Sequence, residues 1–220
     1  MLDPEHHDRD LYSRITAEAA QYYDARLPYH NFEHVRSVLA HAERIIADCR
    51  SEGVPIDAEV VRYAVLFHDA DYAEDHRAKG YDSKEAYAAA LATTVLEPFD
   101  VDPHLIQRVQ STIMATHHAQ PFSTNEEKAI RAADLANMAG LYEDFLESNR
   151  RLKAETEILS GTTMSWAEWK AGTKTTVEWY LNQDIRLTSH HDDEHGFSVF
   201  HQQAQKNLQR FLADETTETT

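Results

Sequence analysis

Residues 57–71 of the chain, DAEVVRYAVLFHDAD, form an apolar segment that ends in a histidine and two carboxylates. Asp57 is of a residue type that caps helix N-termini, and the apolar residues after it recur at helical spacing as far as Phe67. We therefore predict a buried helix from Asp57 to Asp69. A histidine and a carboxylate at the inner end of such a helix, here His68 and Asp69, need polar partners. Taken alone, the pair fits a satisfied core histidine and a functional site equally well.

Helical periodicity continues on both sides of this segment. Further helices are predicted at about residues 11–26, 32–50, 83–96, 102–116, 125–138, 141–159, 164–186 and 197–213. Glycine and proline occur only six times each, and no alternating apolar pattern is long enough for a β-sheet. The sequence therefore predicts an all-α fold in which several helices pack around one buried centre.

The length of 220 residues fits a single domain with a substantial core. We place this domain at residues 11–213, between a flexible N-terminus at residues 1–10 and a flexible acidic tail at residues 214–220. The N-terminus lacks the pattern of a signal peptide, and no apolar stretch reaches the ~18 residues of a membrane span. The single cysteine excludes an internal disulfide. We expect a cytoplasmic protein, whose oligomeric state the sequence leaves open.

The chain carries 21 basic and 38 acidic residues, which give a formal net charge of −17. A field of that sign repels phosphate backbones and anionic membrane surfaces, so we expect neither nucleic acid nor a membrane as a partner. The 14 histidines are the other unusual feature of the composition, because histidine is the commonest metal ligand.

Two further segments place histidine or aspartate among apolar residues. In YHNFEH, which begins at Tyr29, His30 and His34 are four residues apart and share a face if the segment is helical. Asp134 follows two alanines and precedes LANMAG, and a buried carboxylate there needs a partner or a metal. Exposure of Asp134 at the surface, paired with Arg131, is the alternative.

A divalent cation bound by His34, His68, Asp69 and Asp134 would satisfy all of these groups. The mixed set of imidazoles and carboxylates suits Mn, Fe, Co, Ni or Zn better than Ca, and it lacks the thiolates of structural zinc sites. Such a site keeps open positions for water, whose pKa the metal lowers. These residues therefore predict a transition-metal centre that can activate water.

At these residues the chain resembles the HD superfamily of metal-dependent phosphohydrolases, whose ligands are a histidine, a His-Asp pair on another helix and a distant aspartate. The matching positions are His34, His68-Asp69 and Asp134. The Tyr-His-Asn-x-x-His motif is similar to that of cyclic-nucleotide phosphodiesterases and of a group of small bacterial HD proteins. In the phosphodiesterases its first histidine protonates the leaving oxygen, which implies that His30 is the general acid and His34 a ligand.

The resemblance to the small bacterial HD proteins continues at FHDADY (residues 67–72), at Glu85, which matches an acidic position, and at DLANMAG (residues 134–140). It implies an HD-type helical bundle, in agreement with the periodicity. Other branches fit less well. The histidine-proline-glycine stretch that follows His-Asp in the phosphodiesterases is replaced by DYA at residues 71–73, and the Gly-Tyr-Pro signature of the cyclic-di-GMP-degrading branch is absent.

We therefore expect a metal-dependent hydrolase of a phosphate ester or anhydride, with a nucleotide or a related small phosphate compound as substrate. Metal-activated water attacks phosphorus, His30 acts as general acid, and Asp69 orients the water or bridges to a second metal such as Mg. The candidate substrate-binding residues are Asn31, Glu85, His117 and His118.

Two other functions stay open. A di-iron oxygenase of the HD fold would need extra histidines between His-Asp and the last aspartate, and that interval contains His76, His104, His117 and His118. A continuous helix would place His104 and His117 roughly 20 Å apart, which weakens this alternative. A module that binds a nucleotide without turnover is disfavoured, because the four ligand positions and His30 are all present.

Overall fold

The computed structural model describes residues 4–117 and 120–215. Over these ranges the regular elements are α-helices and short 3-10 helices, and the β-type pairing is an isolated bridge between Asp192 and Ser198. The predicted all-α fold is confirmed. The chain forms two compact units, residues 1–133 and 134–220, and the domain boundaries inferred from the sequence stay a prediction. Across the described ranges, no helix has both the length and the apolar composition of a membrane span.

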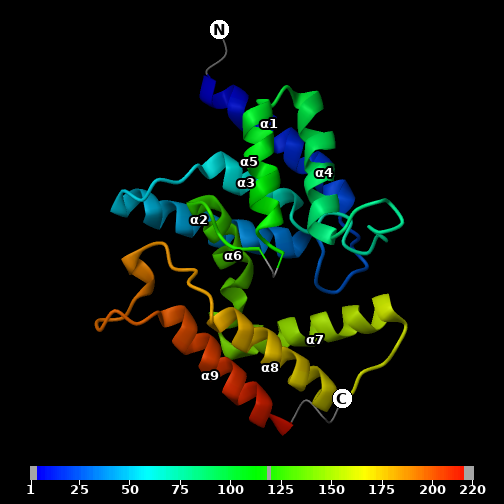
Figure 1. The fold of residues 1–220 in the computed structure, drawn as a ribbon, viewed down its shortest axis with the longest axis vertical. Helices are drawn as coiled ribbons and strands as arrows, with labels where there is room; N and C mark the ends of the chain where they lie inside the picture. Colours follow the sequence, from blue (N-terminus) through cyan, green and yellow to red (C-terminus); the bar gives the residue numbers. More distant parts are fainter. Residues whose placement is uncertain (1–3, 118–119, 216–220) are drawn as a thin grey trace. The chain divides into compact units, whose positions relative to one another are not determined.

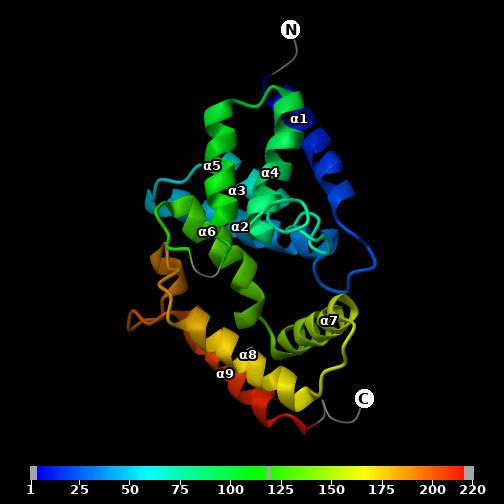
Figure 2. The same cartoon turned by 45° about the vertical axis from the view of Figure 1, so that its right-hand side comes forward.

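Helix α3 (Ala58–Phe67) is the central element of the first unit and contacts α1, α2, α4 and α5. It begins where the Asp57 side chain accepts hydrogen bonds from the backbone N–H groups of Glu59 and Val60. Most of its side chains are buried, and Phe67 has no exposed surface. A helix that is apolar on nearly all sides is stable only where other helices cover it, as they do here (Figures 1 and 2).

The other helices of the first unit surround or extend this centre. They are α1 (Pro4–Ala19), α2 (Phe32–Glu52), α4 (Lys84–Leu96), α5 (Pro103–Met114) and α6 (Asn125–Asp134), with 3-10 helices η1 (Ala20–Tyr22) and η2 (Glu97–Phe99). Helices α4 and α5 lie side by side in both views (Figures 1 and 2). The buried face of α4 includes the small side chains of Ala88, Ala89 and Ala92, which favour close packing.

The second unit is also helical. It contains η3 (Leu135–Ala139), α7 (Tyr142–Ser160), α8 (Trp166–Leu181), η4 (Ser189–His191) and α9 (Val199–Ala213). Its core surrounds Phe211, whose ring meets that of Phe145 edge to face with centroids 5.6 Å apart. Asn207 of α9 donates hydrogen bonds to the carbonyl oxygens of Met138 and Gly140 at 2.9 and 3.0 Å, which ties α9 to η3. Helices α8 and α9 pack side by side (Figures 1 and 2).

Several helix boundaries differ from those predicted from the sequence; among them, the helix predicted at residues 11–26 ends at Ala19 and continues as the 3-10 helix η1 to Tyr22. Helix α1 begins at Pro4, earlier than predicted, because proline is well tolerated in a first helical turn. The helix predicted at residues 125–138 changes to 3-10 geometry after Asp134. Helix α8 ends at Leu181 instead of residue 186, because Asn182 follows and its side chain donates a hydrogen bond back to the carbonyl of the last turn.

Candidate metal centre

The start of α2 places His34 in the first turn of that helix. Asn31 Oδ1 accepts hydrogen bonds from the backbone N–H groups of Glu33 at 2.9 Å and His34 at 3.3 Å. The Asn31 amide also donates to the carbonyl of Leu27 at 2.8 Å. This N-cap explains why the helix begins at Phe32. His34 is buried, with 7% of its surface exposed.

His68 directly follows the last residue of α3, and its ring centroid lies 5.5 Å from that of His34. His68 Nδ1 lies 2.9 Å from the carbonyl oxygen of Val65. A carbonyl can only accept, so this contact is made by an Nδ1–H, and in the neutral ring that tautomer has its lone pair on Nε2, the nitrogen that can bind a metal. Metal-ligating histidines are commonly oriented by a hydrogen bond of this kind.

Asp69 joins the two histidines. Its Oδ2 lies 2.9 Å from His68 Nε2 and 3.5 Å from His34 Nε2. Burial alone would raise the pKa of Asp69, but the imidazoles of His68, His30 and His34 together hold this pKa well below its ordinary value. The carboxylate is therefore ionised at neutral pH, as a metal ligand must be.

Asp134 completes a group of four. It is the last residue of α6, and the residues of α6 before it belong to the first unit. His34, His68, Asp69 and Asp134 each offer one ligand atom, and these atoms all lie within 4.8 Å of one another. Two imidazole nitrogens and two carboxylate oxygens at this spacing form a donor set that suits a divalent transition metal. The residues present thus fit such an ion.

His30, the predicted general acid, lies beside this group. Its ring meets that of His34 edge to face with centroids 5.8 Å apart. The His30 ring also meets that of Tyr29 edge to face, with centroids 4.9 Å apart, and it stacks on Tyr72 with centroids 3.5 Å apart and an interplanar angle of 11°. A general acid must reach the atom that it protonates, and contact with a residue of the four-residue group keeps His30 close to any substrate held there.

Of the remaining predicted site residues, Asn31, Glu85 and His117 lie outside the group of four. Asn31 uses its side-chain amide for the N-cap of α2. Glu85 lies in the first turn of α4. His117 follows α5, and its carbonyl accepts a hydrogen bond from the buried Arg131 at 2.9 Å. His118 lies outside the described residues, and the roles predicted for all four in substrate binding stay predictions.

Two of the histidines that a di-iron site would require, His104 and His117, lie apart. His104 lies in the first turn of α5, and His117 lies beyond its last residue, Met114. A helix of that length extends over about 18 Å, so the two rings cannot serve one centre. This geometry disfavours a di-iron centre that uses both residues.

Two residues beside His30 were not predicted from the sequence. Tyr72 forms the stack described above, and Lys84 Nζ lies 3.4 Å from the centroid of the Tyr72 ring. Tyr72 belongs to the FHDADY motif, and this motif is the sequence feature that could have indicated a tyrosine at the site. The motif alone does not say in which direction the tyrosine ring points.

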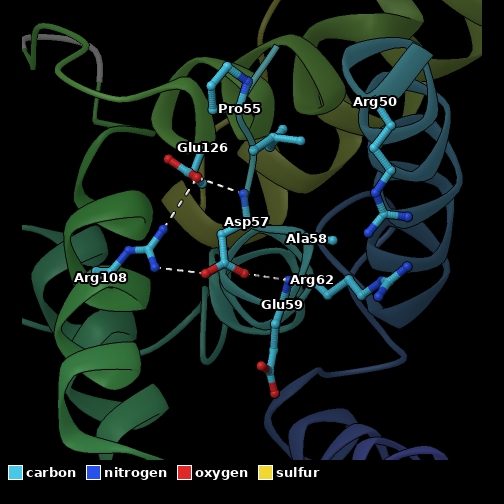
Figure 3. Close-up of a pocket in the computed structure, with 9 residues that line it drawn as sticks. Arg50, Pro55, Asp57, Ala58, Glu59, Arg62, Arg108 and Glu126 are labelled. Carbon is cyan, nitrogen blue, oxygen red and sulfur yellow. Dashed lines mark hydrogen bonds and ion pairs between the residues drawn. The ribbon is translucent and has the colours of Figure 1, made fainter. Parts of the chain in front are cut away.

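A separate cavity of about 600 Å³ lies in the first unit, lined by residues of α2, α3, α5 and α6 (Figure 3). At its edge, Arg108 reaches Asp57 Oδ2 at 2.7 Å and Glu126 Oε1 at 3.3 Å. Arg62 forms an ion pair with Glu43. The lining includes no residue of the four-residue group, and these arginines are already matched by carboxylates. The cavity is therefore distinct from the candidate metal centre.

The fold is similar to that of a solved structure described as LmjPDEB1 in complex with IBMX. The match has a TM-score of 0.60 at 16% sequence identity, and it covers 94% of this chain and 83% of the other. No protein-family model matches the chain, and no curated protein matches it. At this level of identity the likeness concerns the fold, which is all-helical and phosphodiesterase-like.

Proposed function

We propose that this protein is a metal-dependent hydrolase of phosphate esters or anhydrides and a member of the HD superfamily. The observation that carries the proposal is the group of His34, His68, Asp69 and Asp134, whose ligand atoms lie within 4.8 Å of one another. The likeness in fold to a phosphodiesterase supports the reaction class. Because that phosphodiesterase is described in complex with a small ligand, a nucleotide or a related small phosphate compound is the substrate class that we propose.

The two imidazoles and two carboxylates would hold Mn, Fe, Co, Ni or Zn. When bound, the metal supplies positive charge next to the phosphate and lowers the pKa of water in the site. Asp69, whose Oδ2 lies against both imidazoles, would hold the metal and orient the attacking water or share a second ion such as Mg.

His30 donates a proton to the leaving oxygen, and general acid catalysis of this kind is typically worth about 10²–10⁴-fold in rate. Its ring contacts His34 but lies outside the four-residue group, so loss of the imidazole should leave metal binding intact. The net charge of −17 repels extended polyanions, and the metal offsets this repulsion only locally. A small phosphate compound is therefore favoured over nucleic acid.

The test is hydrolysis of mono-, tri- and cyclic nucleotides by the metal-reconstituted protein, with metal content measured in the same samples. His30→Ala should retain the metal and lose about 10²–10⁴-fold in rate. His104→Ala, which changes a histidine in α5 outside the group, is the matched control and should retain both the metal and the wild-type rate. Full activity of His30→Ala, or a metal-loaded wild type that hydrolyses no phosphate compound, would contradict the proposal.

A further inference from the structure

The loop between α3 and α4 turns sharply at Asp71, immediately before Tyr72. Asp71 has a φ of 53°, in the left-handed region that few residues other than glycine adopt. Two contacts hold it there. Its backbone N–H donates to the carbonyl of Tyr22 at 2.8 Å, and its Oδ2 accepts from the Tyr87 hydroxyl at 3.0 Å. The direction in which the chain leaves Asp71, and therefore the placement of Tyr72, is set by residues of η1 and α4.

Tyr72 lies between two groups that a phosphate-cleaving site can use. The His30 ring is nearly parallel to the Tyr72 ring, with centroids 3.5 Å apart. Lys84 Nζ lies 3.4 Å from the same Tyr72 centroid. Two groups so close to one centroid cannot share a face of the ring without a clash. Lys84 and His30 therefore cover opposite faces of Tyr72.

We propose that Tyr72 and Lys84 are positioning residues that hold the His30 ring in the orientation needed to protonate the leaving group. The inference rests on the proposed role of His30 as general acid. An imidazole on a surface turn rotates about two side-chain bonds, whereas stacking on a fixed ring confines its plane. The cation on the far face of Tyr72 holds that ring through a cation–π contact. Misplacement of a catalytic group by about 1 Å can cost 10²-fold in rate, so this confinement matters to catalysis.

The alternative is that Tyr72 only packs the loop, and matched variants separate the two roles. Tyr72→Leu removes the stack, whereas Tyr72→Phe keeps the ring and removes only the hydroxyl. Lys84→Met removes the cation. Tyr180→Leu and Lys153→Met are the controls, because these residues form aromatic and cation–π contacts with Trp179 and Trp166 in the second unit, outside the loop that contains Tyr72.

In hydrolysis assays, Tyr72→Leu should lower kcat by about 10²-fold with KM and metal content little changed, and Tyr72→Phe should restore most of the rate. Lys84→Met should lower kcat by about two- to fivefold, the size of an exposed cation–π contact. In the His30→Ala background, Tyr72→Leu should cause no further loss, because a positioning residue acts through the group that it positions. An equal loss in Tyr72→Leu and Tyr180→Leu, or an additive loss in the double variant, would overturn the proposal.

The position of the His30 ring can also be measured without turnover, so that failure of the positioning role can be distinguished from failure of the proposed hydrolase function. In the NMR spectrum, the ring protons of His30 should be shifted upfield by the Tyr72 ring. The shift should be lost in Tyr72→Leu and kept in Tyr72→Phe. If the wild type shows the shift but hydrolyses no phosphate, the proposed function fails and the positioning role fails with it, although the stack exists. If the wild type hydrolyses phosphate and Tyr72→Leu leaves the His30 signals and kcat unchanged, only the positioning role is refuted.

Discussion

Replacement of Asp69 by asparagine should remove most of the stabilisation that a divalent metal gives to the fold. Oδ2 of Asp69 lies 2.9 Å from His68 Nε2 and 3.5 Å from His34 Nε2, so the change removes a charged ligand and nearly preserves its shape. At a metal concentration of 100 times Kd, the wild type gains about 2.7 kcal/mol. Loss of a direct ligand should weaken binding at least as much as the ~10²-fold loss seen for outer-sphere partners. The same metal concentration then stabilises the variant by no more than about 0.4 kcal/mol.

Thermal unfolding with and without Mn²⁺ measures this difference. For a chain of this size, 1 kcal/mol corresponds to about 2–4 °C in Tm, so the metal should raise the Tm of the wild type by about 5–10 °C and that of the variant by about 1 °C. Asp82→Asn, which changes an exposed carboxylate in the same loop, should keep the wild-type increase. An equal increase in Asp69→Asn and in the wild type would refute the assignment of Asp69 as a ligand.

Three other changes test the fold around the site. Phe67→Ala should lower the free energy of unfolding in urea by about 3–5 kcal/mol, because Phe67 is fully buried in α3; a loss under about 1 kcal/mol would contradict this packing. Glu43→Gln should lower the free energy of unfolding by about 0.2–1 kcal/mol at neutral pH, because it removes a partly exposed ion pair with Arg62. Hydrogen bonds from Arg62 hold the pKa of Glu43 below its ordinary 4.5, so this contribution is present above pH 4.5 and is lost as the pH falls through the lower folded value. A difference from the wild type that persists unchanged in acid would therefore exclude this ion pair as its source. Asn31→Ala should lower the free energy of unfolding by about 0.5–2 kcal/mol and weaken metal binding in a competition titration, because the cap orients His34. Wild-type values of both quantities would contradict this role of Asn31.

The fold was predictable where local signals agree with packing. Asp57 and the apolar spacing after it predicted a helix at residues 57–69, and α3 occupies Ala58–Phe67 with Asp57 as its N-cap. The change to 3-10 geometry after Asp134 was not predictable in the same way. The segment DLANMAG continues the composition of α6, and no proline or glycine precedes Gly140 to mark the change.

The candidate site divides in the same way between predictable and unpredictable parts. The sequence predicted one metal centre from four residues, because all four needed polar partners and their order along the chain resembles that of the HD superfamily ligands. These residues are His34, His68, Asp69 and Asp134. The placement of Tyr72 against His30 depends on a left-handed conformation at Asp71, which non-glycine residues adopt only when their surroundings impose it. The surroundings here are Tyr22 and Tyr87, which come from other elements. No local pattern contains that information.

Elemental analysis of the purified, metal-reconstituted protein tests the metal centre most directly, with wild type, His68→Ala and His104→Ala compared side by side. The wild type and His104→Ala should retain stoichiometric divalent transition metal after dialysis. His68→Ala should lose it, because the change removes one of the two imidazole ligands of the four-residue group. Equal metal content in wild type and His68→Ala, or no retained metal in any of the three, would contradict a metal centre at His34, His68, Asp69 and Asp134.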